Sequence, residues 1–118
     1  MKNFDNGYLQ IILTRKGGAV SMSWQGKSDD SNPSVSLNPY LEQLVNELKG
    51  DELFIEYNTL KYMNSSTVMP IMQFMKNLEA GGIKTMITYD SGSDWQRATF
   101  SALQALSCIM NNITVKAI

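Results

Sequence analysis

The sequence predicts an α/β fold built on a mixed β-sheet. Three observations support this prediction. After residue 50, apolar runs typical of strands alternate with helical patterns, and near the N-terminus a glycine pair separates two apolar runs. The length of 118 residues suits one hydrophobic core. Strands that alternate with helices pair in parallel through right-handed crossovers. We therefore expect one domain over residues 1–118, with three helices packed against a sheet that starts with an antiparallel hairpin.

The hairpin is predicted from two apolar runs on either side of Gly17–Gly18. The runs are Tyr8–Leu13 and Val20–Trp24, and glycine can adopt the positive φ angles that a tight hairpin turn needs. In the second run apolar residues alternate with serines, so one face of that strand should be buried and the other solvated. The following segment, Gln25–Ser36, is polar and rich in turn-forming residues, and we expect a loop there.

The first helix is predicted to follow this loop. Asn38 is the expected capping residue, and Pro39 would then occupy the first helical position. Apolar residues recur at helical spacing from Tyr40 to Leu48, and Gly50 is the expected stop. Next, Leu53–Tyr57 is a short apolar run, which is typical of a central strand covered on both faces.

The second helix is predicted from an apolar stripe that ends at Gly81–Gly82. The stripe consists of Val68, Ile71, Met72, Met75 and Leu78. Pro70 should lie in the first turn, because a proline deeper in a helix costs roughly 3 kcal/mol. This helix should therefore begin near Ser66 or Thr67.

The last third of the chain predicts a strand, a helix and a final strand. The strands are Thr85–Tyr89 and Ile113–Ile118, and Ser93 with Gln96 matches a capping box for the helix between them. We expect Cys108, near the end of that helix, to be a small buried residue. The predicted apolar face of the helix consists of Trp95, Ala98, Ala102, Leu103 and Leu106.

Composition argues against several classes of function. The net charge is −1, with 10 basic and 11 acidic residues, so there is no electrostatic signal for nucleic acid or an anionic membrane. The N-terminus lacks the apolar core of a signal peptide, and no apolar run is long enough to cross a bilayer. The chain has no histidine, the usual general base and metal ligand, and no phosphate-binding loop. We expect a cytoplasmic protein that is not an enzyme and holds no cofactor or metal.

The turn at residues 64–67, Asn-Ser-Ser-Thr, is the predicted functional site. In a parallel sheet the loops at the carboxyl ends of the strands lie along one edge, where ligands and partners usually bind. One interpretation is that the hydroxyl side chains cap the second helix. The other is that one hydroxyl is phosphorylated, because a phosphate at a helix N-terminus meets free N–H donors and adds charge to a binding surface. The two interpretations are compatible.

The segment from Glu52 to Ile87 resembles the central part of a STAS domain (sulfate transporter and anti-sigma-factor antagonist). Its pattern is an apolar strand, a short loop, Asp-Ser-Ser/Thr-Gly, a helix, Gly-Gly and another strand. In anti-anti-sigma factors, the serine directly after the aspartate is phosphorylated by a serine kinase that is also the anti-sigma factor, and a PP2C-type phosphatase reverses this. By position, the resemblance places that serine at Ser65.

Two positions depart from the STAS pattern. Asn64 stands in place of the aspartate, and Thr67 stands in place of the glycine. This version is closer to the small STAS-like regulators of the SiaC kind, which bind and control a diguanylate cyclase and are switched by a kinase and a phosphatase. The resemblance thus implies a bacterial signalling regulator whose partner is an anti-sigma factor or serine/threonine kinase, or a diguanylate cyclase.

The predicted site residues fall into two groups. The candidate phosphorylation sites are Ser65, Ser66 and Thr67, and the candidate partner-binding residues are Tyr62, Met63, Asn64 and Met69. Methionine repacks easily, and Met69 lies off the apolar stripe of the helix, which favours contact with a partner. Two other classes stay open: an unphosphorylated STAS-like scaffold or self-associating module whose hydroxyls only cap the helix, and a small enzyme or nucleotide-binding domain that uses the same sheet edge.

Overall fold

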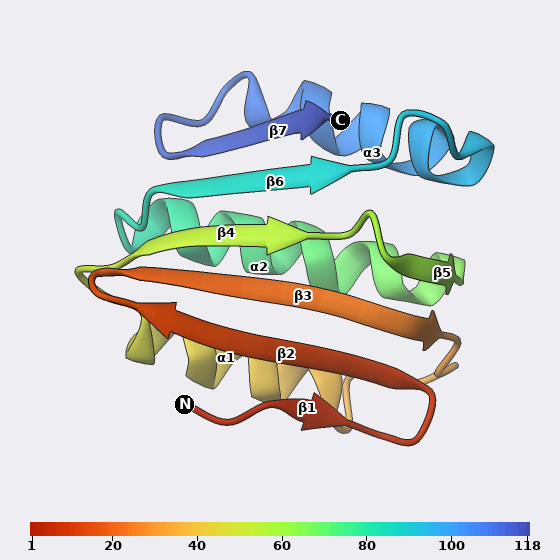
Figure 1. Ribbon diagram of the computed structural model, residues 1–118, viewed down its shortest axis with the longest axis horizontal. Coiled ribbons are helices and arrows are strands. Elements are labelled where there is room, and N and C mark those ends of the chain that lie inside the picture. Colours follow the sequence, from red (N-terminus) through yellow and green to blue (C-terminus); the bar gives the residue numbers. More distant parts are fainter.

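A computed structural model describes residues 1–118 and contains one mixed sheet with helices beside it (Figure 1). The helical segments are α1 (Leu37–Glu47), the 3₁₀ turn η1 (Ser65–Thr67), α2 (Val68–Ala80) and α3 (Asp94–Ser107). The strands are β1 (Phe4–Asp5), β2 (Leu9–Lys16), β3 (Ala19–Ser28), β4 (Glu52–Glu56), β5 (Leu60–Met63), β6 (Thr85–Tyr89) and β7 (Ile113–Ala117).

The sheet combines antiparallel and parallel pairing, as predicted. Its strand order is β1-β2-β3-β4-β6-β7, with β5 paired to the second part of β3. Strands β1, β2 and β3 are antiparallel neighbours, whereas β3, β4, β6 and β7 are parallel. Gly17, with φ of 63°, forms part of the tight turn between β2 and β3. The predicted mixed sheet with an N-terminal antiparallel hairpin and three helices is confirmed.

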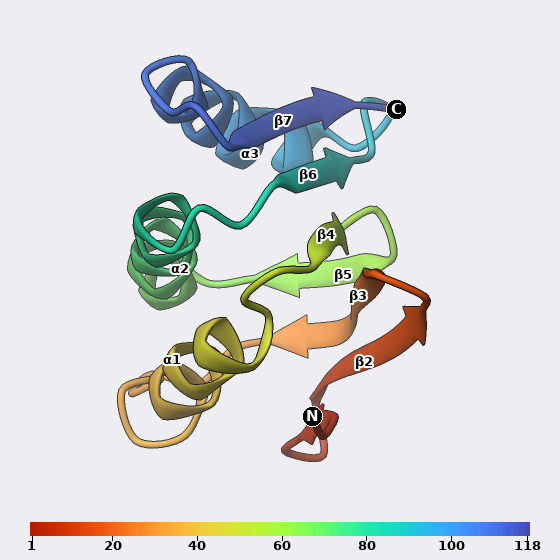
Figure 2. The same ribbon diagram turned by 90° about the vertical axis from the view of Figure 1, so that its left-hand side faces the viewer.

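All three helices lie on the same face of the sheet (Figure 2). From β3 onward each parallel strand is added on the same side of the previous one, so right-handed crossovers return every helix to one face. A cluster of 25 buried apolar residues fills the space between sheet and helices. The prediction that Leu53–Tyr57 is covered on both faces is therefore wrong: Leu53 and Ile55 are buried, but Phe54 on the opposite face is 40% exposed.

Strand β3 is longer than predicted because of Gly26. Its φ is 84°, and a Cβ atom there would lie 2.1 Å from the carbonyl oxygen of Tyr8, so only glycine fits. The strand register shifts at this residue, as in a β-bulge, and the strand continues to Ser28. Residues 26–28, predicted as loop, thus pair with β5, a strand that was not predicted. The short strand β1 was not predicted either.

The first helix starts two residues earlier than predicted. Ser36 is at the cap position and makes no side-chain hydrogen bond there, so Asn38 is inside the helix and is not its cap. Pro39 is the third helical residue. This position is tolerated because backbone N–H groups in the first turn have no intrahelical acceptor.

Helix α2 begins at Val68, so Pro70 lies in its first turn, as predicted. Its buried face is formed by Pro70, Ile71, Phe74, Met75 and Leu78. Val68 and Met72 of the predicted stripe are only partly buried. Phe74, which was not part of the predicted stripe, is buried.

Helix α3 has its predicted cap but a different buried face. The Ser93 hydroxyl accepts a hydrogen bond from the Gln96 backbone N–H, as expected. The buried residues are Gln96, Phe100, Leu103 and Ser107, whereas the predicted Ala98 and Ala102 are exposed. Gln96 Nε2 donates to the carbonyl oxygens of Tyr57 and Leu60, at 2.9 and 3.0 Å, and this buried contact sets the rotation of the helix. Cys108 is exposed, so the prediction that it is buried is wrong.

Candidate functional site

Residues Asn64–Thr67, hereafter the hydroxyl segment, connect the end of β5 to the start of α2. The backbone N–H of Asn64 donates to the carbonyl oxygen of Ser28 at 2.9 Å, which extends the pairing of β3 and β5 by one residue. The 3₁₀ turn begins immediately afterwards, at Ser65. The segment is thus fixed at its start by the sheet and at its end by the helix.

Asn64 caps the helical path with its side chain. Its Oδ1 accepts hydrogen bonds from the backbone N–H of Thr67 at 3.1 Å and from the Thr67 hydroxyl at 2.8 Å. Its Nδ2 donates to the carbonyl oxygen of Asp30 at 3.0 Å. Asparagine is among the preferred capping residues because its oxygen satisfies a free helix N–H. Asn64 therefore holds the segment in place, and both ends of its amide are occupied within the chain.

The Thr67 hydroxyl belongs to a buried network. The side chain is fully buried, and its Oγ1 lies 2.8 Å from the Oγ of Ser28, which is also buried. A hydroxyl carries a single proton, so when Thr67 donates to Asn64, Ser28 donates to Thr67. A kinase cannot reach this oxygen without opening the segment.

Ser65 and Ser66 differ from Thr67 in both exposure and bonding. Ser65 is exposed and Ser66 partly exposed, and neither hydroxyl forms a hydrogen bond within the chain. Their backbone N–H groups lie at the start of the helical path, where no intrahelical acceptor exists. The prediction that these hydroxyls cap the helix is wrong, because Asn64 supplies the cap.

The predicted partner-binding residues differ in how exposed they are. Tyr62 is 48% exposed and Met69 is 65% exposed. Ser65 and Met69 are four residues apart along one helical path, so they lie on neighbouring turns of the same face. Met63, by contrast, is partly buried and packs against the core. The accessible surface at this end of the molecule is therefore formed by Tyr62, Ser65 and Met69.

Sequence reasoning missed Ser28 and Asp30, which anchor the hydroxyl segment. A signal for Ser28 exists: the inward-facing positions of β3 recur every second residue through Trp24, and the same alternation reaches Ser28. The Asp30 contact uses a backbone carbonyl, so no side-chain pattern indicates it.

The structure contains neither a cluster of metal-binding side chains nor a helix that could cross a membrane. No group of three or more histidine, cysteine or acidic side chains is placed to hold a metal ion. None of the helices has the length and apolar character required to span a membrane.

Comparison with known proteins identifies similar structures but no similar sequences. No protein-family model matches the chain, and no curated protein matches it. A chain in the crystal structure of the diguanylate cyclase SiaD in complex with its activator SiaC, from Pseudomonas aeruginosa, is 20% identical, with a TM-score of 0.64 and coverage of 100% of both chains.

Two anti-sigma factor antagonists are also similar in structure. The protein from Mycobacterium paratuberculosis is 12% identical, with a TM-score of 0.66 over 93% of this chain and 88% of that chain. The antagonist SpoIIAA in its unphosphorylated form is 17% identical, with a TM-score of 0.56 over 77% of this chain and 81% of that chain. The chain therefore has the STAS-like fold of the SpoIIAA-like regulators, and the neighbours that define this fold are regulatory proteins.

Proposed function

We propose that this protein is a non-enzymatic bacterial signalling regulator that binds a partner protein and is switched by reversible phosphorylation of Ser65. The observation that carries the proposal is the contrast within the hydroxyl segment: Ser65 is exposed with a free hydroxyl, whereas Thr67 is buried and hydrogen-bonded. Ser66 is the second candidate because it is partly exposed. Thr67 is left out of the proposal.

A phosphate on Ser65 would change the character of the surface around it. It adds close to two negative charges, which the free N–H groups at the start of the helical path can accommodate within the protein. The neighbouring Tyr62 and Met69 present apolar surface to a partner. A partner fitted to those side chains would have to bury the dianion as well, which is unfavourable without a matching cation. Phosphorylation should therefore weaken binding.

The proposed partners follow from the structural neighbours. Coverage of 100% of both chains in the SiaD–SiaC comparison favours a diguanylate cyclase as the partner. The similarity to anti-sigma factor antagonists supports the second possibility, an anti-sigma factor that is also a serine kinase. In either case a serine/threonine kinase would add the phosphate and a PP2C-type phosphatase would remove it.

Affinity capture with the wild-type protein and three variants tests this proposal. The wild-type protein and its Ser65→Ala variant should retain the same partner from a lysate of the native cells, and Ser65→Asp should retain roughly tenfold less. Ser101→Asp is the matched control, because Ser101 is an exposed serine on α3. Equal capture by Ser65→Asp and wild type, quantified by mass spectrometry, would contradict the switch. Loss of capture by Ser101→Asp would show a non-specific effect of charge.

A further inference from the structure

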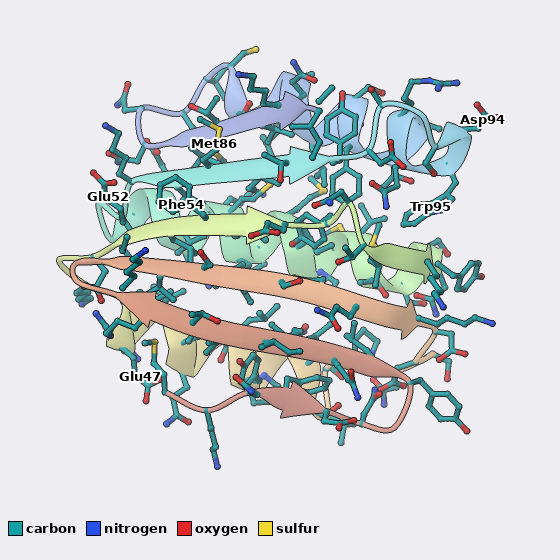
Figure 3. The ribbon with its side chains drawn as sticks, in the orientation of Figure 1. Glu47, Glu52, Phe54, Met86, Asp94 and Trp95 are labelled. Carbon is teal, nitrogen blue, oxygen red and sulfur yellow. The ribbon has the colours of Figure 1, made fainter.

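We propose that the sheet face opposite the helices is the contact surface of a homodimer. This open face is defined by side chains of β3, β4, β6 and β7 that point away from the core (Figure 3). They are Ser21, Glu52, Phe54, Glu56, Lys84, Met86, Thr88, Thr114 and Lys116. The surface is separate from that around Ser65, so the inference goes beyond the proposed function.

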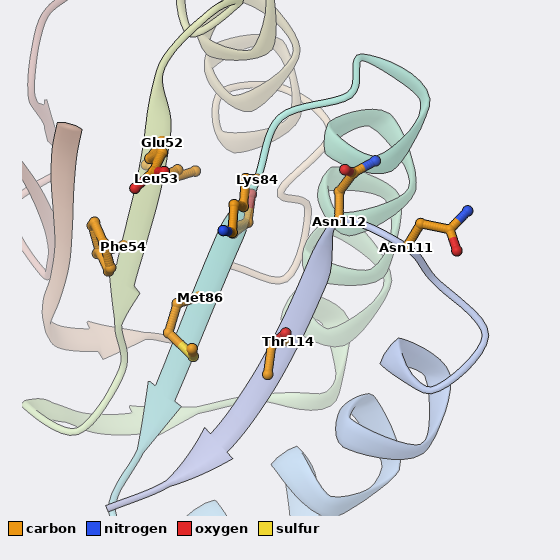
Figure 4. Close-up of a pocket in the computed structure, with 9 residues that line it drawn as sticks. Glu52, Leu53, Phe54, Lys84, Met86, Asn111, Asn112 and Thr114 are labelled. Carbon is orange, nitrogen blue, oxygen red and sulfur yellow. The ribbon is translucent and has the colours of Figure 1, made fainter. Parts of the chain in front are cut away.

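Phe54 and Met86 form a ridge on the open face, with a hollow on either side of it. Phe54 and Met86 are directly opposite each other on β4 and β6, and both are at least partly exposed. A hollow of about 290 Å³ lies between them and Thr114 (Figure 4). A second hollow, of about 330 Å³, is lined by the same two side chains together with Ser21 and Thr88. The two large apolar side chains thus stand between two hollows whose other lining residues are mostly polar.

The strand register places these features in two rows across β4, β6 and β7. One row is Phe54, Met86 and Thr114, and the next is Glu56, Thr88 and Lys116. Strand β6 is the middle strand of both rows. Two copies can face each other across a two-fold axis that runs parallel to β6, midway between the two sheets. Rotation about this axis lays β4 of one copy over β7 of the other, and each row lies over the same row of the second copy.

This symmetry operation makes the open face complementary to itself. It places Phe54 of one copy over Thr114 of the other, at the edge of the first hollow, and the contact occurs twice. Sheets that pack face to face lie about 10 Å apart, at an angle of about 30° that their twist imposes, so a phenyl ring spans the gap.

The charges on the open face also match under the same operation. Glu56 of one copy faces Lys116 of the other, and neither residue forms an ion pair within its own chain. Lys84 of each copy lies near the axis, with Glu52 of the second copy one strand, or about 4.8 Å, to the side. The acidic residues of the open face lie on β4, and the basic ones lie on or beside β6 and β7. Each lysine that faces the other copy therefore has a glutamate of that copy opposite it or one strand away. The operation brings Met86 and Lys84 opposite their own copies, but it pairs Phe54 with Thr114 and Glu56 with Lys116 twice each, and this favours a second copy as the occupant.

Charge reversal tests the dimer directly. Sedimentation equilibrium of the wild-type protein should show a monomer–dimer equilibrium at protein concentrations up to ~100 μM. Glu56→Lys or Lys116→Glu alone should raise the dimer Kd about tenfold, and the double variant should return it to the wild-type value. Glu42→Lys is the matched control, because Glu42 is an exposed glutamate on α1, on the other side of the sheet. Its Kd should equal that of wild type.

Removal of the Phe54 side chain gives a second test of the dimer. Phe54→Ser should raise the Kd roughly thirtyfold, since a large aromatic side chain at the centre of an interface is a typical hot spot. Circular dichroism of each variant shows whether it is folded. A wild-type protein that is monomeric throughout this range would overturn the proposal. So would a dimer whose Kd responds equally to Glu56→Lys and Glu42→Lys, or a double variant that stays as weak as the single ones.

Discussion

The two ends of helix α2 are held by different kinds of hydrogen bond. At the N-terminal end a neutral amide, Asn64, bonds to Thr67 and to the backbone of Asp30. At the C-terminal end the Glu79 carboxylate accepts the backbone N–H groups of Asn111 and Asn112, at 2.9 and 2.7 Å. These N–H groups lower the pKa of Glu79.

The two anchors therefore differ in charge. The N-terminal anchor is uncharged, so its contribution to stability should not depend on pH. The C-terminal anchor needs its charge to bind two N–H groups, and its stability contribution therefore depends on pH.

The N-terminal end depends first on Gly26, whose bulge carries β3 on to Ser28. Gly26→Ala should lower the free energy of unfolding by about 3 kcal/mol, because alanine must adopt a positive φ and its Cβ meets the Tyr8 carbonyl oxygen. Gly18→Ala is the matched control, since a Cβ there meets nothing within 4 Å and its φ is not positive. Urea unfolding of both variants measures the difference, and equal small losses would disprove the role of the bulge.

The next experiment separates the anchoring side chain from the free one. Asn64→Ala should lower the free energy of unfolding by about 2 kcal/mol, because it removes a helix cap and two hydrogen bonds to the buried Thr67. Ser65→Ala should change it by less than about 0.5 kcal/mol, since the Ser65 hydroxyl bonds to nothing in the chain. Chemical denaturation compares the two. A loss on Ser65→Ala as large as that on Asn64→Ala would mean that Ser65 is structural.

Acidification should affect the C-terminal end alone. The pKa of Glu79 is lowered in the folded protein from its ordinary value of 4.5, so its stabilising contribution is present above that pH and is lost as the pH falls through the lower folded value. The Glu79→Gln variant should therefore lose less stability than wild type when the pH drops from neutral to below 4.5. Thermal unfolding across this range measures the slope. Asn64→Ala should keep the wild-type slope, and a flatter one would show that the two ends are coupled.

Much of this fold could be predicted because the sequence signals are local. The glycine pair at the hairpin, Pro70 at the start of α2 and Ser93 before α3 each determine the backbone within a few residues, and all three predictions were confirmed. Contacts between distant residues could not be predicted in this way. The buried face of α3 depends on Gln96 reaching Tyr57 and Leu60, 39 and 36 residues away in the chain.

The candidate site shows the same limit. The resemblance to STAS domains singled out Ser65, but the residue pattern alone did not distinguish the three hydroxyls at residues 65–67. What separates them is the continuation of β3 to Ser28, which buries Thr67 and leaves Ser65 outside. That continuation depends on a close approach of Gly26 to Tyr8, which only the folded chain reveals.

Peptide mass spectrometry on the protein purified from its native cells locates the modified residue of the proposed switch. We predict a phosphate on Ser65, with Ser66 as the only neighbouring alternative, and none on Thr67, whose hydroxyl is buried. A phosphate on Thr67, or no phosphate under any growth condition, would disprove the proposed switch. The first result would require the hydroxyl segment to open, and the second would favour an unphosphorylated scaffold.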